Sequence, residues 1–555
     1  MPKKYLIILL LCLSMHQAFA KKQQTKTTPP RLVIMFVIDQ GSWTQYIQKL
    51  RPHFNAGLHE LLNEGIVYTN AHHPHAIPET TTGHHAMSTG ALPKDHGGIL
   101  NQWIDQNYKK IAYDDDHSPE AAVYDSKCPI GKSCKNTMVD GISDQCRLAS
   151  KQSNRYKVFA LAIKSYPAIA MANRRGKALW FDATTGNFTS SKKYFKTALP
   201  GWVQEFNKEH DIPKLTSITW QTCYELKDKA YTFPYVNNYD YAGHTSLISR
   251  RKKPIAIPID HSAQYPYQYF MKTPYATKAL MDFAKDCLDN NLTGKDDRML
   301  LWISISTLDL AGHIYGPDSL ETIDLMYHID KQIKIMMDHA RKKVGAKNCL
   351  FGLTADHGII PIPEISQKRG IDNARRIMVQ PLIKAMNKLA LKKYRIKEVI
   401  KGFEPTYFAL NKEALDTLNE DKRENAIKDL KHFLEGQKGI KKVWTAHELP
   451  NLSFDASEQQ ENYYKMQYFK NRMSGLICMT HPYSLLTTYP TGTSHCDPHN
   501  DNTQVPLVLY QQGRYEHKTI ADRVVIQQLP ITLARILEVA RPSASSYEVL
   551  PGVAW

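Results

Sequence analysis

The strongest constraint on the fold is a set of short, unbroken apolar runs that each end in a charged or polar residue. The first spans residues 31–40 (RLVIMFVIDQ) and ends around Asp39. Continuous runs of β-branched and apolar residues are typical of strands that are buried on both faces of a parallel sheet. The same pattern recurs at residues 157–164, 298–309, 348–356 and 504–510.

Helical patterns separate these runs, as at residues 319–343, where apolar side chains recur every three or four positions. Alternation of strands and helices predicts an α/β fold with a doubly wound, mostly parallel sheet flanked by helices. Ligands of such sheets bind beyond the carboxyl ends of the strands. We therefore expect Asp39, Lys164, Asp309 and Asp356 to lie together at that edge.

Length alone allows a large buried core and roughly two to four domain-sized units. The chain has 555 residues, 42% hydrophobic and 23% charged, which excludes disorder, collagen and coiled coil. We expect residues 31–555 to form one domain with two insertions. The first, at about 200–265, is rich in Tyr, Lys and Pro, lacks strong periodicity and predicts a cap or long loop. The second, at about 366–480, predicts a small α+β subdomain, with strand-like pieces at 407–410 and 443–444 around an amphipathic stretch at 422–437.

The first twenty residues predict a secretory signal peptide. Lys3 and Lys4 precede an apolar run at 6–13, and Ala18-Phe19-Ala20 supplies a small-x-small cleavage pattern. Residues 21–30 then predict a disordered lead-in. No apolar run reaches the roughly 20 residues that a membrane-spanning helix needs. We expect an exported protein, periplasmic or secreted, without stable membrane insertion.

The formal net charge of +17 favours anionic partners. The Lys/Arg clusters at 250–253 and 392–393 are short and isolated, so we interpret them as solvated faces and expect no nucleic-acid partner. Small anionic esters fit this charge better.

Eight cysteines follow the predicted leader, and an even number in an exported protein permits disulfides. Cys128 and Cys134 form the most favourable local pair, and buried free thiols are the alternative. The connectivity stays open.

Three segments that combine histidine with acidic or small polar residues carry the chemistry. Asp309 and His313 are four residues apart after a predicted strand, Asp356 and His357 are adjacent after another, and His495 closes the segment GTSH before the last. Asp and His are ligands that suit zinc or a similar first-row ion. Together with Asp39 at one sheet edge, they predict a metal centre.

A hydroxyl nucleophile is available in the segment 77–90 (IPETTTGHHAMSTG). Its threonines stand where a loop leads into a helix, and the N-terminus of a helix favours anions. A threonine alkoxide needs a cation to stabilise it at neutral pH, which the neighbouring metal centre supplies. Helix capping is the alternative role of Thr80, Thr81 and Thr82.

These motifs together resemble the alkaline phosphatase superfamily, and within it the bacterial periplasmic phosphatases that use threonine as nucleophile, with a core like that of type I phosphodiesterases and nucleotide pyrophosphatases. The matching pieces occur in the family's order over nearly the whole chain after the leader: FVIDQ, TTTGHHAMSTG, HGGILNQWID, AIK, STLDLAGHIYGPDS, TADHG and TGTSH.

The resemblance implies a hydrolase of phosphate esters with two zinc ions. One ion would be held by Asp309, His313 and His495, and the other by Asp39, Asp356, His357 and the Thr80 oxygen. Thr80 would form a phosphothreonine intermediate. Asn101 would donate a hydrogen bond to a phosphoryl oxygen, and Lys164 would add charge to the same group, directly or through water.

One departure bears on the substrate. Related phosphomonoesterases carry Lys-x-Arg where this chain has Lys164-Ser165-Tyr166. Loss of the arginine fork weakens the preference for a dianion over a monoanionic diester. We expect a secreted phosphomonoesterase, with a phosphodiesterase or nucleotide pyrophosphatase as the alternative and Thr81 as a second candidate nucleophile. A non-catalytic binding protein is disfavoured by the intact ligand set. The physiological ester, the metal in the cell and the oligomeric state stay open.

Overall fold

The computed structural model describes residues 28–126, 128–150, 156–233, 248, 256–453, 455, 457 and 459–553. The predicted signal peptide, residues 21–27 of the predicted lead-in and the basic cluster 250–253 lie outside these ranges. The end of the lead-in is described: the carbonyl oxygens of Pro29 and Pro30 accept hydrogen bonds from the Arg298 guanidinium at 2.6 and 3.3 Å. This contact attaches residues 29–30 to the start of a central strand.

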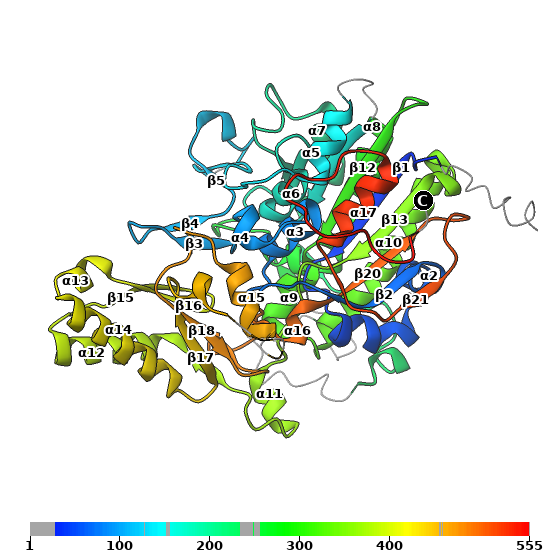
Figure 1. Ribbon diagram of the computed structural model, residues 1–555. Helices are drawn as coiled ribbons and strands as arrows, with labels where there is room; N and C mark the ends of the chain where they lie inside the picture. Colours follow the sequence, from blue (N-terminus) through cyan, green and yellow to red (C-terminus); the bar gives the residue numbers. More distant parts are fainter. Residues whose placement is uncertain are drawn as a thin grey trace, which may run out of the picture.

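A ten-stranded sheet forms the centre of the molecule (Figure 1). Each of the five predicted runs contributes one of its strands, so the predicted α/β fold is confirmed. Its order is β21 (Lys518–Ile520), β2 (Ile66–His72), β20 (Gln504–Tyr510), β13 (Cys349–Thr354), β1 (Leu32–Ile38), β12 (Arg298–Ile305), β7 (Tyr156–Ala162), β8 (Lys177–Asp182) and β9 (Asn187–Thr189), with β22 (Val524–Val525) beside β2.

The strands from β13 to β8 run parallel, as predicted. Strand β20 is antiparallel to both β13 and β2, so the parallel pattern read for residues 504–510 was wrong. Its composition is the same because it too is buried on both faces, and burial does not distinguish strand direction. An antiparallel strand begins at the edge where its parallel neighbours end. The segment before β20 therefore reaches the carboxyl edge of the parallel strands.

Helices cover both faces of the sheet, which explains the unbroken apolar runs. Alternate residues of β1 point to opposite faces. Leu32, Ile34 and Phe36 pack with helices α2 (Gly57–Glu64), α8 (Pro274–Asn291) and α10 (Leu320–Val344). Val33 and Met35 pack in a second core with α3 (Thr80–Thr89), α5 (Ile142–Ala149), α6 (Ser165–Ala172) and α17 (Gln528–Leu537).

A smaller α+β unit projects from the main body, at the lower left of Figure 1. Its antiparallel sheet has the order β15 (Ile400–Glu404), β16 (Tyr407–Leu410), β18 (Leu476–Thr480) and β17 (Ile440–Thr445). Helices α12 (Val379–Tyr394), α13 (Lys412–Asp416) and α14 (Glu420–Glu435) share a separate hydrophobic core with this sheet. The short strands β14 (Arg376–Met378) and β19 (Leu485–Thr487) pair in parallel near its attachment.

The segment that begins at residue 200 is more regular at its start than its weak periodicity suggested. Helix α7 (Gly201–His210) opens it, and strand β10 (Ser217–Thr219) pairs with β11 (Ala256–Pro258). The short helix η6 (Lys229–Tyr231) packs near α10.

The eight cysteines of the described ranges are free thiols, so the expected Cys128–Cys134 pair is not formed. Between them, β6 (Gly131–Lys132) pairs with β5 (Asp115–Asp116). Cys134 is buried beyond this strand, whereas Cys128 is exposed and its thiol donates to the Ile130 carbonyl.

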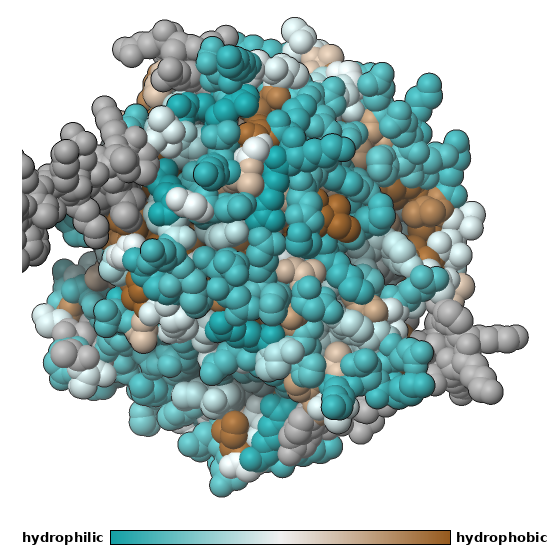
Figure 2. All heavy atoms as spheres, turned by 90° about the vertical axis from the view of Figure 1, so that its right-hand side faces the viewer, coloured by the Kyte–Doolittle hydropathy of each residue, from teal (hydrophilic) through white to brown (hydrophobic). Residues whose placement is uncertain are grey.

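Among the helices of the described ranges, none has the length and apolar character needed to cross a lipid bilayer. The face seen in Figure 2 is mostly hydrophilic, with apolar side chains in small, separate groups.

Candidate active site and metal centre

Four neighbouring strands bring charged side chains to one edge of the main sheet. Asp356 follows β13, Asp39 follows β1, Asp309 follows β12, and Lys164 follows β7. Because these strands are adjacent and parallel, their carboxyl ends meet at the same place. All four side chains are buried there.

The first group of potential metal ligands consists of Asp309, His313 and His495. Asp309 and His313 lie one turn apart on α9 (Thr307–Tyr315), and His313 Nε2 is 3.1 Å from Asp309 Oδ1. His495 Nε2 approaches the same oxygen at 3.7 Å. The Nδ1 atoms point away: that of His313 donates to the Thr493 carbonyl at 3.1 Å, and that of His495 donates to the Pro78 carbonyl at 2.9 Å.

The second group consists of Asp39, Asp356 and His357. His357 Nε2 lies 3.5 Å from Asp39 Oδ1 and 3.4 Å from Asp356 Oδ2. Its Nδ1 donates to the Gly358 carbonyl at 2.9 Å. The Thr80 hydroxyl oxygen is 3.4 Å from the same Nε2, so the candidate nucleophile borders this group.

Both groups have the donor chemistry that a divalent first-row ion requires. In all three histidines Nδ1 donates to a carbonyl, which leaves Nε2 facing the carboxylate oxygens and available to a metal. Metal-bound histidines are typically oriented in this way. Asp39 Oδ1 and Asp356 Oδ2 are buried and accept no hydrogen bond within the described part of the chain. Buried carboxylate oxygens of this kind are costly unless a cation meets them.

The carboxylates are held at strongly perturbed pKa values. Burial, and then the charge of Asp356, raises the pKa of Asp39 well above its usual range. Burial opposes ionisation of Asp309 too, but His313 and Lys164 outweigh it and hold the pKa of Asp309 well below its usual range. Three carboxyl groups close together at one buried edge favour the binding of cations there.

Thr80 is the first residue of α3, and the positive end of the helix dipole there favours an anion. Glu79 precedes the helix, and its N–H donates to Thr82 Oγ1 at 2.8 Å. The helix packs closely on the second ligand group because Gly83 has no side chain: a Cβ there would lie 2.1 Å from the Asp356 carbonyl oxygen.

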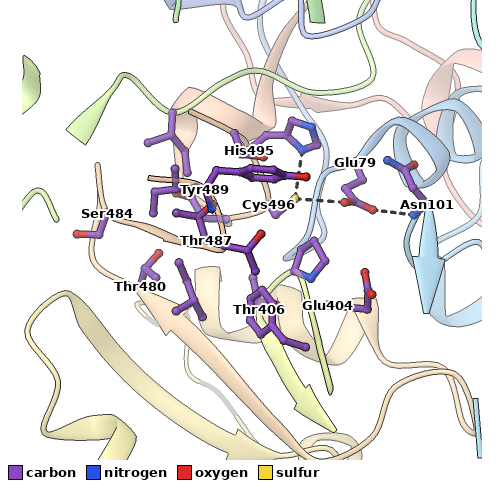
Figure 3. A pocket seen from close by; sticks show the side chains of 18 of the residues that line it. Glu79, Asn101, Glu404, Thr406, Thr480, Ser484, Thr487, Tyr489, His495 and Cys496 are labelled. Carbon is purple, nitrogen blue, oxygen red and sulfur yellow. Dashed lines mark hydrogen bonds between the residues drawn. The ribbon is translucent and has the colours of Figure 1, made fainter. Parts of the chain in front are cut away.

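Asn101 lies beside this helix start. Its Oδ1 accepts from the Thr81 N–H at 2.9 Å, which makes the side-chain amide NH₂ its donor end. Its backbone N–H donates to Glu79 Oε2 at 2.7 Å (Figure 3). Burial raises the pKa of Glu79 to about 7, and the Asn101 N–H opposes that rise. These two bonds fix Asn101 beside the first turn of α3, which carries Thr80.

Lys164 lies between the two ligand groups. Its ammonium donates to Asp39 Oδ2 at 2.8 Å and also to Asp309. Burial opposes its charge, but Asp309 and Asp39 hold its pKa well above the usual range. The Lys164 nitrogen is 5.6 Å from the centre of the Tyr166 ring. Where the sequence suggested contact with a phosphoryl group, the structure shows contact with carboxylates of both groups.

Two further residues contact these groups, and the sequence reasoning gave neither a role. The Gln40 N–H donates to Asp356 Oδ1 at 3.0 Å, and its side-chain amide donates to Asp309 Oδ1 at 2.8 Å. His84 Nδ1 donates to the Thr80 carbonyl at 2.7 Å and lies 3.2 Å from Asp356 Oδ2. The polar residue directly after Asp39 was the available signal for Gln40.

A cavity of about 290 Å³ adjoins the site where the smaller unit meets the main body (Figure 3). Asn101 and His495 contribute from the side of the ligand groups. Polar side chains of the smaller unit and its connections form the other side, among them Glu404, Thr406, Thr480, Ser484, Thr487 and Tyr489. The cavity can accept the organic part of an ester.

Comparisons with known proteins agree with this fold. The alkaline phosphatase PhoV of Synechococcus elongatus is 26% identical over 568 residues, covering 98% of this chain and 99% of PhoV. The alkaline phosphatase PafA of Elizabethkingia meningoseptica is 30% identical over 363 residues, 64% of each chain. The crystal structure of wild-type PafA superposes with a TM-score of 0.81 at 21% identity, covering 95% of this chain and 100% of that one.

The fold, the two ligand groups and these relatives define a phosphoesterase of the alkaline phosphatase superfamily. The sequence profile of the type I phosphodiesterase / nucleotide pyrophosphatase family matches residues 33–503, and the chain belongs to that family.

Proposed function

We propose that this protein is a phosphomonoesterase that works through a phosphothreonine on Thr80. The observation that carries the proposal is the position of the Thr80 hydroxyl, 3.4 Å from His357 Nε2 and at the positive end of α3. A nucleophile next to an anion-binding helix start and two groups of metal ligands suits in-line displacement at phosphorus.

Two zinc ions fit the donor sets. Asp309, His313 and His495 would hold one, and Asp39, Asp356, His357 and the Thr80 oxygen the other. When bound, a pair of such ions lowers the pKa of a coordinated hydroxyl and neutralises charge on the attacking and leaving oxygens.

The chain's own residues supply binding and orientation. The Asn101 amide NH₂ donates to a non-bridging phosphoryl oxygen, and the positive end of α3 attracts the anion. Thr80 Oγ1 attacks phosphorus and passes its proton to water, while the P–O bond to the leaving alcohol breaks and the departing oxygen takes a proton from water. Water then hydrolyses the phosphothreonine. Lys164 balances the charge of Asp39 and Asp309, and it adds positive charge toward the phosphoryl group.

A relative supports these assignments. PafA has been solved as a variant in which a threonine, an asparagine, a lysine and, two positions after the lysine, an arginine are replaced together. Thr80, Asn101 and Lys164 supply the first three side-chain types here, and Tyr166 stands two positions after the lysine.

Tyr166 favours one alternative, a phosphodiesterase or nucleotide pyrophosphatase. A neutral phenol removes one full charge from the phosphoryl site and admits a monoanionic diester more readily. We keep the phosphomonoesterase as the proposal because Asn101 and Lys164, the two other side chains expected to act on the phosphoryl group, are both present. The substrate partner is a small phosphate ester, whose organic group the cavity of about 290 Å³ receives.

The proposal also includes the domain organisation of the chain and its location in the cell. Residues 31–555 act as one catalytic domain that carries a cap at about 200–265 and the α+β insertion at about 366–480. Residues 1–20 direct export, so the enzyme works in the periplasm or outside the cell.

The test compares 4-nitrophenyl phosphate with bis(4-nitrophenyl) phosphate on zinc-loaded protein. We expect a higher kcat/KM for the monoester, at least two zinc ions per chain, and loss of activity after chelation that zinc restores. A clear diester preference contradicts the monoesterase and favours the alternative.

Thr80→Ala and Thr81→Ala form a matched pair for the nucleophile. Thr81 is equally buried, and its hydroxyl has no hydrogen-bond partner in the described ranges. We expect Thr80→Ala to lose at least 1,000-fold in kcat, in line with loss of a nucleophile, and Thr81→Ala to stay within about threefold. The reverse result assigns the nucleophile to Thr81.

A further inference from the structure

We propose that this protein binds an additional zinc ion, outside the active site, through Cys223, Asp324 and His328. One ligand atom from each of these residues lies within 4.8 Å of the other two. Zinc binds Cys sulfur at about 2.3 Å and His nitrogen or carboxylate oxygen at about 2.0–2.2 Å. Such a set of sulfur, nitrogen and oxygen donors is a typical zinc environment.

The two helical ligands repeat the spacing of an active-site pair. Asp324 and His328 lie four residues apart on α10, as Asp309 and His313 do on α9. His328 Nε2 is 3.3 Å from Asp324 Oδ2, against 3.1 Å between Nε2 and Oδ1 in the other pair. Two ligands about 2.0–2.1 Å from a tetrahedral ion are roughly 3.3 Å apart. The pair is therefore already spaced for one ion.

The carboxylate is buried and held in position by donors. Asp324 is 0% exposed. The Trp220 indole N–H donates to Oδ2 at 2.6 Å, and the Cys223 N–H and the Tyr231 hydroxyl donate to Oδ1. Carboxylates that ligate metals are commonly oriented by such hydrogen bonds. With these bonds in place, Oδ2 lies toward His328.

A fourth ligand and access are available. His328 Nε2 donates to the backbone oxygen of Gln221 at 3.0 Å. Metal binding releases this proton to solvent, and Nε2 and the neutral Gln221 oxygen then face the same ion. The His328 side chain is 24% exposed, so an ion and a water molecule reach the site from solvent.

The ion would join two parts of the fold that are far apart in sequence. Cys223 belongs to the segment between β10 and η6, whereas Asp324 and His328 belong to α10, which packs on the main sheet. A bound ion fixes this segment to the helix and stabilises the folded state by its binding free energy.

Cobalt(II) absorption distinguishes this site from the active site, whose proposed ligands include no sulfur. The purified, reduced protein is loaded with Co(II), and thiolate-to-cobalt charge transfer is measured in the near ultraviolet. We expect the band in the unchanged protein and in Cys128→Ser, which removes an exposed thiol. We expect its loss in Cys223→Ser and in His328→Gln.

Zinc content and stability provide a second readout. We expect three zinc ions per chain, and two in Cys223→Ser with unchanged phosphatase activity. The Tm of the unchanged protein should exceed that of Cys223→Ser in zinc, and the two values should converge with EDTA. A missing band, a band that persists in Cys223→Ser, or only two zinc ions in the unchanged protein overturns the proposal. Because the cobalt band requires a sulfur ligand, the test of this site is independent of the test of the proposed phosphomonoesterase activity.

Discussion

Gly83 controls how closely the nucleophile's helix approaches the metal ligands. In Gly83→Ala the new Cβ would lie 2.1 Å from the Asp356 carbonyl oxygen and 2.6 Å from two further backbone atoms of Asp356. Ordinary contact begins at about 3.4 Å, so α3 and residue 356 must separate by roughly 1.3 Å. Thr80 moves with the helix, and misplacement of about 1 Å costs on the order of 100-fold in rate.

Helix propensity alone predicts the opposite sign for stability, since alanine is favoured over glycine by about 1 kcal/mol inside a helix. Overpacking costs about 1–3 kcal/mol, so we expect a net loss of roughly 0–2 kcal/mol in the free energy of unfolding. Gly201→Ala at the start of α7 is the control, because a Cβ there meets nothing within 4 Å.

The assay is kcat/KM with 4-nitrophenyl phosphate, together with Tm. We expect a loss of about 100-fold for Gly83→Ala and no change for Gly201→Ala. If Gly83→Ala keeps its activity within threefold, the close approach of α3 to Asp356 does not position the nucleophile and the reasoning fails.

Three further changes test the site and the fold. Tyr166→Arg should raise the ratio of monoester to diester kcat/KM about 10–100-fold, since a charged bidentate contact contributes roughly 1.5–3 kcal/mol; an unchanged ratio rejects Tyr166 as the selective residue. Gln40 has a backbone φ of 71°, which glycine adopts readily, so Gln40→Gly removes only the side-chain donor to Asp309. We expect zinc binding to weaken about 10–100-fold in a chelator competition. An unaltered affinity contradicts a bridging role of Gln40. Burial raises the pKa of Asp144 from 3.8 to about 6, so the folded state keeps a proton that the unfolded chain releases, and stability falls as the pH rises through this window. In Asp144→Asn this decline, about 2 kcal/mol between pH 4.5 and 7.5, should be absent when urea unfolding is measured at those two pH values, and an unchanged decline assigns it to other groups.

The strands of the core were predictable because their cause is local. A strand covered by helices on both faces needs an apolar side chain at every position, as residues 32–38 show, and that requirement is visible in sequence. The polar residues that follow such strands were predictable for the same reason, since the chain leaves the core there. The order of the motifs along the chain then indicated which of these residues correspond to the metal ligands of the family that the sequence resembles.

Other elements of the sheet gave no such pattern. Strand β2 reads IVYTNAH, with a polar stretch at a bulge, and was not predicted. The direction of β20 was open because burial constrains composition and not direction. The free thiol of Cys128 depends on how β6 pairs with β5, which the spacing to Cys134 does not determine.

The sequence by itself determined the apolar strands, the charged ends that follow them and the order of the motifs, because each depends on residues that are neighbours along the chain. Only the tertiary structure decided which distant groups share one place. His495 reaches Asp309 because β20 runs antiparallel, Gln40 spans both ligand groups because β13, β1 and β12 are adjacent, and Cys223 meets Asp324 and His328 because the segment after β10 packs on α10. Strand order and packing bring these side chains together, and neither can be predicted from the local periodicity of the sequence.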